Sequence, residues 1–188
     1  MRVLEATTKT LLGGHSKGIS MGQDNFPTGR ISRTTTGYEG RLERVLAHDA
    51  AAVWTMLTDP AAMAQWLAQG SIEQHEGGAV RIDFSDSGIV IDSTVTAFHE
   101  GQLLEYSWSS GSQPQRPLRW ELSPVNGGTL LALCVHVPQE EDPATACAGF
   151  EGHLEMLAAA LEGVSIRFPF DLFLQARKGY GEQVVALD

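Results

Sequence analysis

One long apolar stripe near the C-terminal end most constrains what this chain can fold into. Apolar residues recur there at helical spacing, namely Cys147, Phe150, Leu154, Leu157 and Leu161. This spacing is typical of one face of an α-helix about five turns long. Asp142 can cap its start, Pro143 suits its first turn, and Gly163 ends it. The pattern predicts a helix over 143–162 that must bury one face.

Most of the chain before this helix has the pattern of strands. Leu42, Arg44 and Leu46 alternate with Glu43 and Val45, as in a half-buried strand. Further strand patterns follow at 71–75, 79–84, 89–99, 103–109, 118–122 and 129–137. Gly77-Gly78 and Asn126-Gly127-Gly128 are turn signals between neighbouring strands. Consecutive strands that tight turns join form an antiparallel sheet.

Two short helices are expected directly after the first strand. Asp49 can cap a helix that carries Trp54 on its apolar side. Asp59 and Pro60 then form the cap and first residue of a second helix, which carries Trp66.

These elements predict one α+β domain, in which a curved antiparallel sheet of about seven strands wraps around one long C-terminal helix. A strongly curved sheet around a single helix leaves space between them. That space is the natural site for a small ligand.

The two ends of the chain differ from this domain. Residues 1–37 are rich in Gly, Ser and Thr without a sustained period, so we expect a flexible or weakly docked extension. Met21 is an alternative natural start within it. The domain is expected over 38–180, with one short helical turn at 171–178 and a tail over 181–188.

Composition limits the partners and the cellular compartment. The formal net charge is −10, and an acidic protein repels phosphate backbones, so no nucleic-acid partner is expected. The sequence contains no apolar run long enough for a membrane span or a signal peptide. Cys134 and Cys147 could form one disulfide, but two buried thiols in a reducing cytoplasm are the simpler interpretation. We therefore expect a cytoplasmic protein.

Five segments, in order, carry a resemblance to a known family. They are VWTMLTDPAAMAQW (Val53–Trp66), GGAVRIDF (Gly77–Phe84), LLEYSW (Leu103–Trp108), GGTLLALCVHV (Gly127–Val137) and AGFEGHLEMLAAALEG (Ala148–Gly163). Together they resemble the activator of heat-shock protein 90 ATPase homologue branch of the START-like, or SRPBCC, superfamily. The resemblance covers about residues 38–180. Phe150 stands where relatives usually have Trp.

The resemblance implies the helix-grip fold, with a cavity between sheet and long helix that the two short helices gate. Its members include binders of lipids and hormones, aromatases or cyclases acting on polyketides, and co-chaperone domains. The main hypothesis is therefore binding of a small apolar molecule, lipid-like or aromatic. The alternatives are a polyketide cyclase-like enzyme and an activator of a heat-shock ATPase with a chaperone partner. Fold alone does not decide among these.

Nine residues on the elements expected around the cavity are candidates for its wall. Most are aromatic rings or histidines, and the others are one arginine and one leucine. They are Trp66, Arg81, Tyr106, Trp108, Trp120, His136, Phe150, His153 and Leu157. His136 matches the family's strand-end histidine and could donate a hydrogen bond to a ligand carbonyl. His153 flanks the helical stripe and could act as a polar contact or a general acid/base. A charge such as Arg81 on the concave face would be costly unless paired.

Several chemistries lack their motifs. The sequence has no Cys-x-x-Cys, no His-x-His and no histidine pair at helical spacing, so no metal site is expected. The Gly-x-Ser-x-Gly elbow, a phosphate loop and a dinucleotide fingerprint are also missing. We expect no cofactor, name no catalytic residue, and favour binding over catalysis.

Overall fold

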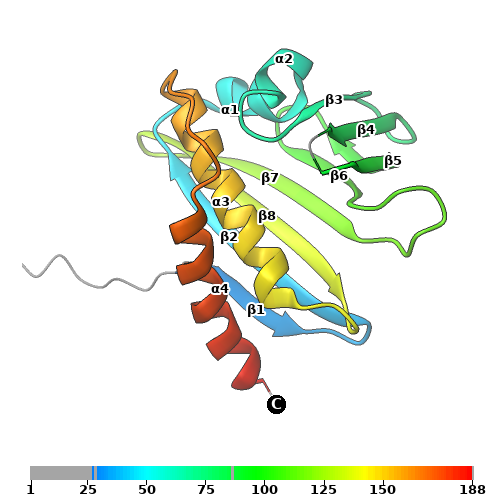
Figure 1. Ribbon diagram of the computed structural model, residues 1–188. Helices are drawn as coiled ribbons and strands as arrows, with labels where there is room; N and C mark the ends of the chain where they lie inside the picture. Colours follow the sequence, from blue (N-terminus) through cyan, green and yellow to red (C-terminus); the bar gives the residue numbers. More distant parts are fainter. Residues whose placement is uncertain (1–26, 28, 86, 188) are drawn as a thin grey trace, which may run out of the picture.

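The computed structural model describes residues 27, 29–85 and 87–187, which form eight strands and four helices (Figure 1). The strands are β1 (Arg30–Arg33), β2 (Gly37–Leu46), β3 (Gln69–Ile72), β4 (Ala79–Phe84), β5 (Ile89–His99), β6 (Leu103–Ser107), β7 (Pro117–Val125) and β8 (Gly128–Pro138). The helices are α1 (Ala50–Thr58), α2 (Pro60–Met63), α3 (Pro143–Leu161) and α4 (Phe170–Val185).

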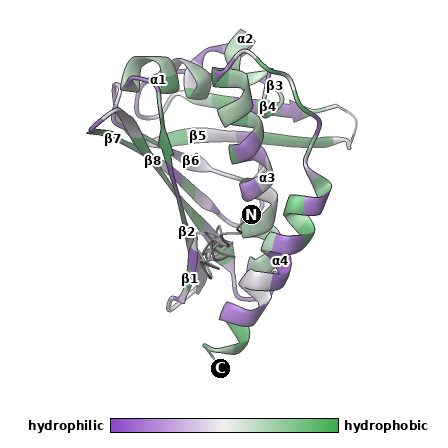
Figure 2. Ribbon diagram, turned by 90° about the vertical axis from the view of Figure 1, so that its left-hand side faces the viewer, coloured by the Kyte–Doolittle hydropathy of each residue, from purple (hydrophilic) through white to green (hydrophobic). Residues whose placement is uncertain are grey.

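All eight strands of the described residues belong to one antiparallel sheet in the order β1-β2-β8-β7-β6-β5-β4-β3. The register shifts between Val95 and Ala97 of β5, and such a bulge bends a strand. The sheet curves, and α3 and α4 lie on one side of it (Figure 2). The α+β helix-grip architecture is confirmed, with eight strands instead of about seven.

Helix α3 buries the predicted stripe. The side chains of Cys147, Leu154 and Leu157 are at most 1% exposed. Burial of one leucine side chain stabilises a fold by about 1.5–3 kcal/mol, so this face holds the helix on the sheet. The Asp142 side chain caps the helix, and Gly163 follows its end with a φ of 73°. The predicted start is therefore confirmed, and the helix ends one residue earlier than predicted, at Leu161.

The two short helices also begin as expected. The Asp49 side chain accepts a hydrogen bond of 2.8 Å from the backbone N–H of Ala52. Asp59 accepts one of 2.9 Å from Ala62, and Pro60 opens the second helix. Both helices lie over one end of the sheet, near the C-terminal end of α3 (Figure 1).

Strand β1 corrects the expected extension over residues 1–37. Residues 30–33 pair with β2, and Ile31 is 6% exposed. The N–H of Ile31 donates a hydrogen bond of 2.9 Å to Gln183, which lies 152 residues away in the sequence. A contact this remote leaves no local pattern, which is why the strand was not predicted. Residues 1–26 and 28, including Met21, lie outside the described residues.

Helix α4 corrects the short turn expected at 171–178 and the tail expected at 181–188. It runs as far as Val185, and its buried residues are Ala176 and Tyr180. Few side chains of α4 are buried, so its sequence lacks the long apolar stripe that marks α3.

The described helices include none that is long and apolar enough to cross a membrane. Cys134 and Cys147 are free thiols; Cys147 is buried as expected, whereas Cys134 is only partly buried. Burial raises the pKa of Cys147 to about 12, so this thiol stays protonated and acts as a small apolar group.

Candidate functional site

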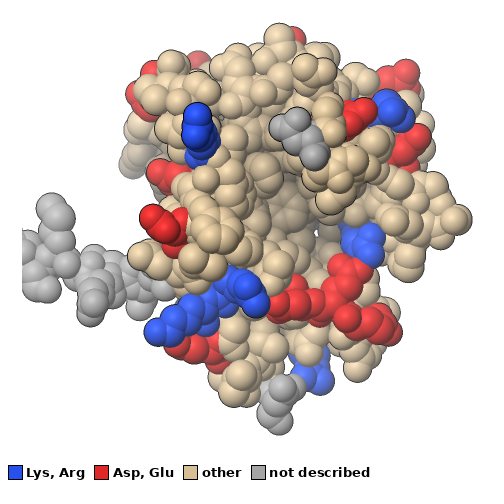
Figure 3. All heavy atoms as spheres, viewed as in Figure 1, with Lys and Arg blue, Asp and Glu red and all other residues tan. Residues whose placement is uncertain are grey.

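A cavity of about 1230 Å³ lies between α3 and the sheet. Its walls come from α3, the start of β5, the ends of β7 and β8 that lie nearest the first turn of α3, and the loops that precede β7 and α3. Figure 3 shows a hollow in the face on which α3 lies, with an uncharged interior and charged groups along its lower edge. A volume of this size is sufficient for a small organic ligand.

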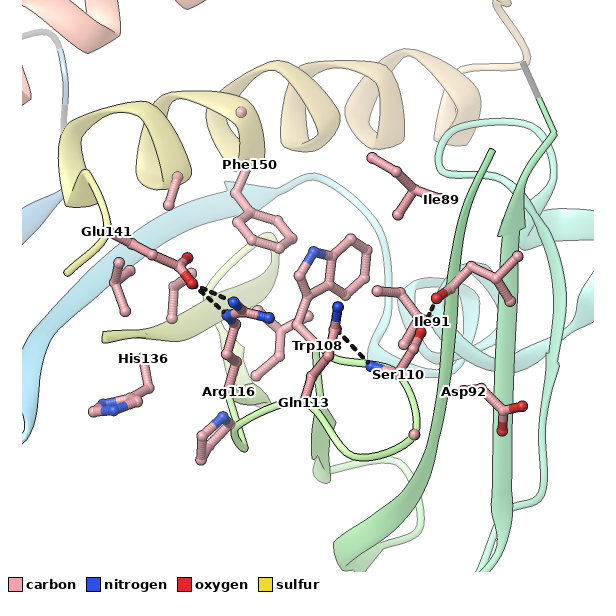
Figure 4. A pocket seen from close by; sticks show the side chains of 18 of the residues that line it. Ile89, Ile91, Asp92, Trp108, Ser110, Gln113, Arg116, His136, Glu141 and Phe150 are labelled. Carbon is pink, nitrogen blue, oxygen red and sulfur yellow. Dashed lines mark hydrogen bonds and ion pairs between the residues drawn. The ribbon is translucent and has the colours of Figure 1, made fainter. Parts of the chain in front are cut away.

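The inner wall of the cavity is aromatic and aliphatic. Trp108 and Phe150 meet edge to face, with ring centroids 5.2 Å apart and an interplanar angle of 67°. Ile91, Leu118 and Val135 add apolar surface around them. In Figure 4, Phe150 points from α3 toward Trp108, and Ile91 points toward the same space. Such a wall favours a flat apolar molecule.

A salt bridge lies at one end of this wall. Nε of Arg116 is 3.0 Å from Oε1 of Glu141, and Nη2 contacts the same oxygen. The Arg116 side chain is only 24% exposed, and its guanidinium lies between Glu141 and Trp108 (Figure 4). A partly exposed ion pair contributes about 0–1 kcal/mol to the stability of the fold. The main effect of this pair is therefore to hold the guanidinium and the carboxylate in fixed positions at the cavity.

The loop between β6 and β7 is fastened to its neighbours. The hydroxyl of Ser110 donates to the carbonyl oxygen of Val90, and its N–H donates to Gln113 over 3.0 Å. At the other end of the loop, the N–H of Arg116 donates to the hydroxyl of Ser107 over 2.8 Å. These bonds hold one wall in place before any ligand arrives, which lowers the entropic cost of binding.

His153 lies further along α3. Its Nδ1 is 3.3 Å from the carbonyl oxygen of Trp66. Because a carbonyl only accepts hydrogen bonds, Nδ1 carries the proton. Burial lowers the pKa of His153, and the hydrogen bond to Trp66 offsets this only in part. The rings of Phe84 and Phe168 flank the imidazole at 6.1 and 5.4 Å. The histidine is therefore neutral near pH 7, and its Nε2 is a hydrogen-bond acceptor.

The structure brings five of the nine predicted wall residues to the cavity, namely Arg81, Trp108, His136, Phe150 and His153. Two of them turn their side chains away from its interior. Arg81 alternates with the buried Val80 and Ile82 and is 58% exposed. Its guanidinium pairs with Asp83 and Asp92, each at 3.7 Å, on the outer face of the sheet.

His136 also corrects an expectation. It alternates with the buried Val135 and Val137 along β8, and its register partner is Glu39 of β2. Figure 4 shows its ring pointing away from Phe150. His136 therefore lies at the rim, and it does not donate into the cavity interior.

Four predicted wall residues do not line the cavity, namely Trp66, Tyr106, Trp120 and Leu157. All four are at most 1% exposed. Trp66 donates a hydrogen bond of 2.8 Å to the carbonyl of Met56 and packs edge to face on Trp120 at 5.9 Å. Burial raises the pKa of Tyr106 well above its usual range. Their burial places all four in the hydrophobic core.

The family resemblance also implied that the two short helices gate the cavity. No described residue of α1 or α2 lines it, so this expectation is wrong for the cavity as it stands here. The wall opposite α3 comes instead from the start of β5 and the loop between β6 and β7.

Sequence reasoning missed Arg116, Glu141, Ser110 and Gln113. All four lie in segments with only a loop pattern, and the Arg116–Glu141 contact joins residues 25 apart. No local pattern indicates that these residues meet.

The described part of the chain contains no group of three or more His, Cys, Asp or Glu residues placed to hold a metal ion. The cavity side chains offer hydrogen-bonding groups and apolar contact, and the titratable acceptors among them include Glu141, which pairs with Arg116, and His153.

Comparisons with solved structures support the fold. EF2215 from Enterococcus faecalis, described as a conserved protein of unknown function, is 19% identical with a TM-score of 0.73, over 88% of this chain and 95% of that one. CalU16 from Micromonospora echinospora is 18% identical with a TM-score of 0.70, over 83% and 96% of the two chains. At such identities the likeness shows the fold alone.

DynU16, described as a protein in the dynemicin biosynthetic locus, is 28% identical with a TM-score of 0.61. The match covers 66% of this chain and 48% of DynU16. A search of curated proteins finds no match.

Residues 47–162, more than half of the chain, match the family described as Activator of Hsp90 ATPase homolog 1-like protein. This segment begins just after β2, ends just after α3, and contains every residue that lines the cavity. The match, the curved sheet and its long C-terminal helix agree with one another, and the chain belongs to this family within the START-like superfamily.

Proposed function

We propose that this protein binds a small hydrophobic molecule, aromatic or lipid-like, in the cavity between α3 and the sheet. The observation that carries the proposal is the cavity of about 1230 Å³ beside the Trp108–Phe150 pair. An apolar ligand that leaves water for such a space gains about 25 cal/mol per Å² of buried apolar surface.

The wall supports binding because it is built before the ligand arrives. The hydrogen bonds of Ser110 and Arg116 fix the loop between β6 and β7 against neighbouring strands. Phe150 is 6% exposed and stands on α3, whose inner face is buried. A preformed site loses little entropy on binding, so buried area contributes more fully to affinity.

Native mass spectrometry of protein purified from its own cells tests the proposal. We expect an added mass in native spectra that disappears on denaturation, together with saturable binding of an anilinonaphthalene dye. An unliganded native spectrum together with no saturable dye binding would contradict the proposal.

A second candidate function is catalysis by a cyclase- or aromatase-like enzyme on a polyketide-like ligand. The observation that favours it is the presence of His153, Arg116 and Glu141 in one apolar cavity. A neutral histidine with an unprotonated Nε2 can accept a proton from a substrate. The occurrence of DynU16 in a biosynthetic locus is in keeping with such a role.

The two functions differ in what happens to the ligand. Incubation of the recovered ligand with fresh protein, followed by liquid chromatography and mass spectrometry, distinguishes them. A binding protein returns the ligand unchanged, whereas a cyclase or dehydratase yields a product that H153F does not form.

A further inference from the structure

The cavity carries polar groups at two opposite ends of one apolar wall. Arg116 and Glu141 lie at the end where α3 begins, and Thr145 lines the cavity in the first turns of this helix. His153 stands eight residues after Thr145, which corresponds to about 12 Å along the helix axis at 1.5 Å per residue. Trp108 and Phe150 lie between the two ends.

The Arg116 end offers hydrogen-bond donors. A guanidinium carries five N–H groups, and Glu141 accepts from Nε and Nη2 through a single oxygen. Within the described residues, Nη1 of Arg116 has no hydrogen-bond partner. This end can therefore donate to a ligand oxygen.

Glu141 disfavours a negatively charged ligand group at this end. The Glu141 carboxylate already neutralises Arg116, and it would repel a ligand carboxylate in this partly desolvated site. A neutral carbonyl oxygen accepts the same hydrogen bonds without that cost.

The His153 end offers an acceptor. The Trp66 carbonyl fixes the proton on Nδ1, so Nε2 carries the free lone pair. Across the described residues, every fully buried side-chain nitrogen or oxygen has a hydrogen-bond partner. Nε2 has none among them, so it retains accessible surface, and His153 lines the cavity. A hydroxyl group of a ligand can donate to this atom.

We propose that the ligand is a neutral, elongated apolar molecule with a carbonyl oxygen at one end, bound by Arg116, and a hydroxyl group at the other, bound by Nε2 of His153. This inference rests on the proposed function and adds the polarity and the orientation of the ligand.

Calorimetric titration with a matched set of naphthalenes tests it. The probes carry a hydroxyl group at one end and an acetyl group at the opposite end, either group alone, or neither. The hydrogen bond to neutral His153 is expected to raise the affinity about 2- to 12-fold, and the hydrogen bond from the charged Arg116 guanidinium about 12- to 160-fold. The doubly substituted probe should bind most tightly, and the unsubstituted one least tightly.

Two variants assign each gain to one side chain. H153F keeps a ring of similar size, and it should remove the gain from the hydroxyl group while the gain from the acetyl group persists. R116M keeps an apolar side chain of similar length. It should remove the gain from the acetyl group while the gain from the hydroxyl group persists. R119M is the matched control because Arg119 pairs with Glu105 and Glu121 and does not line the cavity. Thermal unfolding of each variant verifies that it is folded.

Glu141 supplies a test that gains function. A naphthalene with a carboxylate in place of the acetyl group should bind less tightly than the acetyl probe. E141Q removes the repelling charge, and we expect it to raise the affinity for the carboxylate probe.

The possible failures are distinguishable. If the unsubstituted probe binds but neither polar group adds affinity, or the gains survive H153F and R116M, the inference is overturned and the proposed function stands. If none of these probes binds, the proposed function fails and this inference fails with it.

Discussion

The hydroxyl of Tyr180 on α4 donates a hydrogen bond of 2.5 Å to Oε1 of Glu151 on α3, and both side chains are fully buried. The second oxygen of Glu151 pairs with Arg44 of β2. This chain of contacts connects α4, α3 and the sheet. It lies away from the cavity, whose lining includes none of the three residues.

Tyr180→Phe should destabilise the fold without affecting the site. It leaves Oε1 of Glu151 buried and without a partner, which costs about 1–3 kcal/mol. Urea unfolding measures the loss, and dye binding should be unchanged. Tyr38→Phe is the control, because the Tyr38 hydroxyl forms no hydrogen bond with any described residue. Equal stability of the two variants would contradict the role of the Tyr180–Glu151 bond.

Gly40→Ala tests how closely α3 approaches the sheet. A Cβ at Gly40 would lie 2.2 Å from Sγ of Cys147, whose side chain is fully buried. This steric clash should lower the free energy of unfolding by about 1–3 kcal/mol. Cys147→Ala removes the sulfur, so the double variant should lose less stability than the sum of the single ones. Simple additivity in urea unfolding would show that the helix lies further from β2.

His153 should make the stability depend on pH. Burial lowers its pKa below the ordinary value of 6.5, so the unfolded chain takes up the proton first as the pH falls. Between these two pKa values the unfolded chain binds more protons, and stability decreases as the pH decreases. H153F lacks this contribution.

We therefore expect the free energy of unfolding of the unmodified protein, relative to H153F, to decrease from about pH 7.5 to about pH 5.5. The difference should be constant above about pH 7.5. Urea unfolding over this range measures it, and parallel profiles of the two proteins would contradict a buried neutral histidine.

The sequence predicted the elements whose evidence is local. Strand β5 matches the predicted range, and α3 differs by one residue, because period and caps lie within each segment. Strand β1 and half of α4 were not predicted because their contacts, such as Ile31 with Gln183, join opposite ends of the chain.

The site was harder to predict than the fold. Side chains alternate between the two faces of a strand, but the sequence does not show which face points toward the cavity. Arg81 and His136 sit beside buried residues on β4 and β8, and only the folded sheet shows that their side chains point outward. Phe150 and Leu157 likewise share the apolar face of α3. Only the folded structure shows that Phe150 lines the cavity and Leu157 lies in the core. The Arg116–Glu141 pair depends on two loops meeting, which no local pattern records.

Filling the cavity tests the central claim most directly. A Cβ at Gly149, which lines the cavity on α3, would meet nothing within 4 Å, and the same holds for Gly181 on α4. Leucine at either position should improve helix propensity by about 0.5–1 kcal/mol. Both variants should therefore fold, but only Gly149→Leu places a side chain in the ligand's space.

The measurement is a dye titration of Gly149→Leu and Gly181→Leu beside the unmodified protein. We expect Gly149→Leu to lose at least about 10-fold in affinity, the equivalent of 1.4 kcal/mol, while Gly181→Leu binds as the unmodified protein does. Unchanged binding by a folded Gly149→Leu would show that the ligand does not occupy the space between α3 and the sheet.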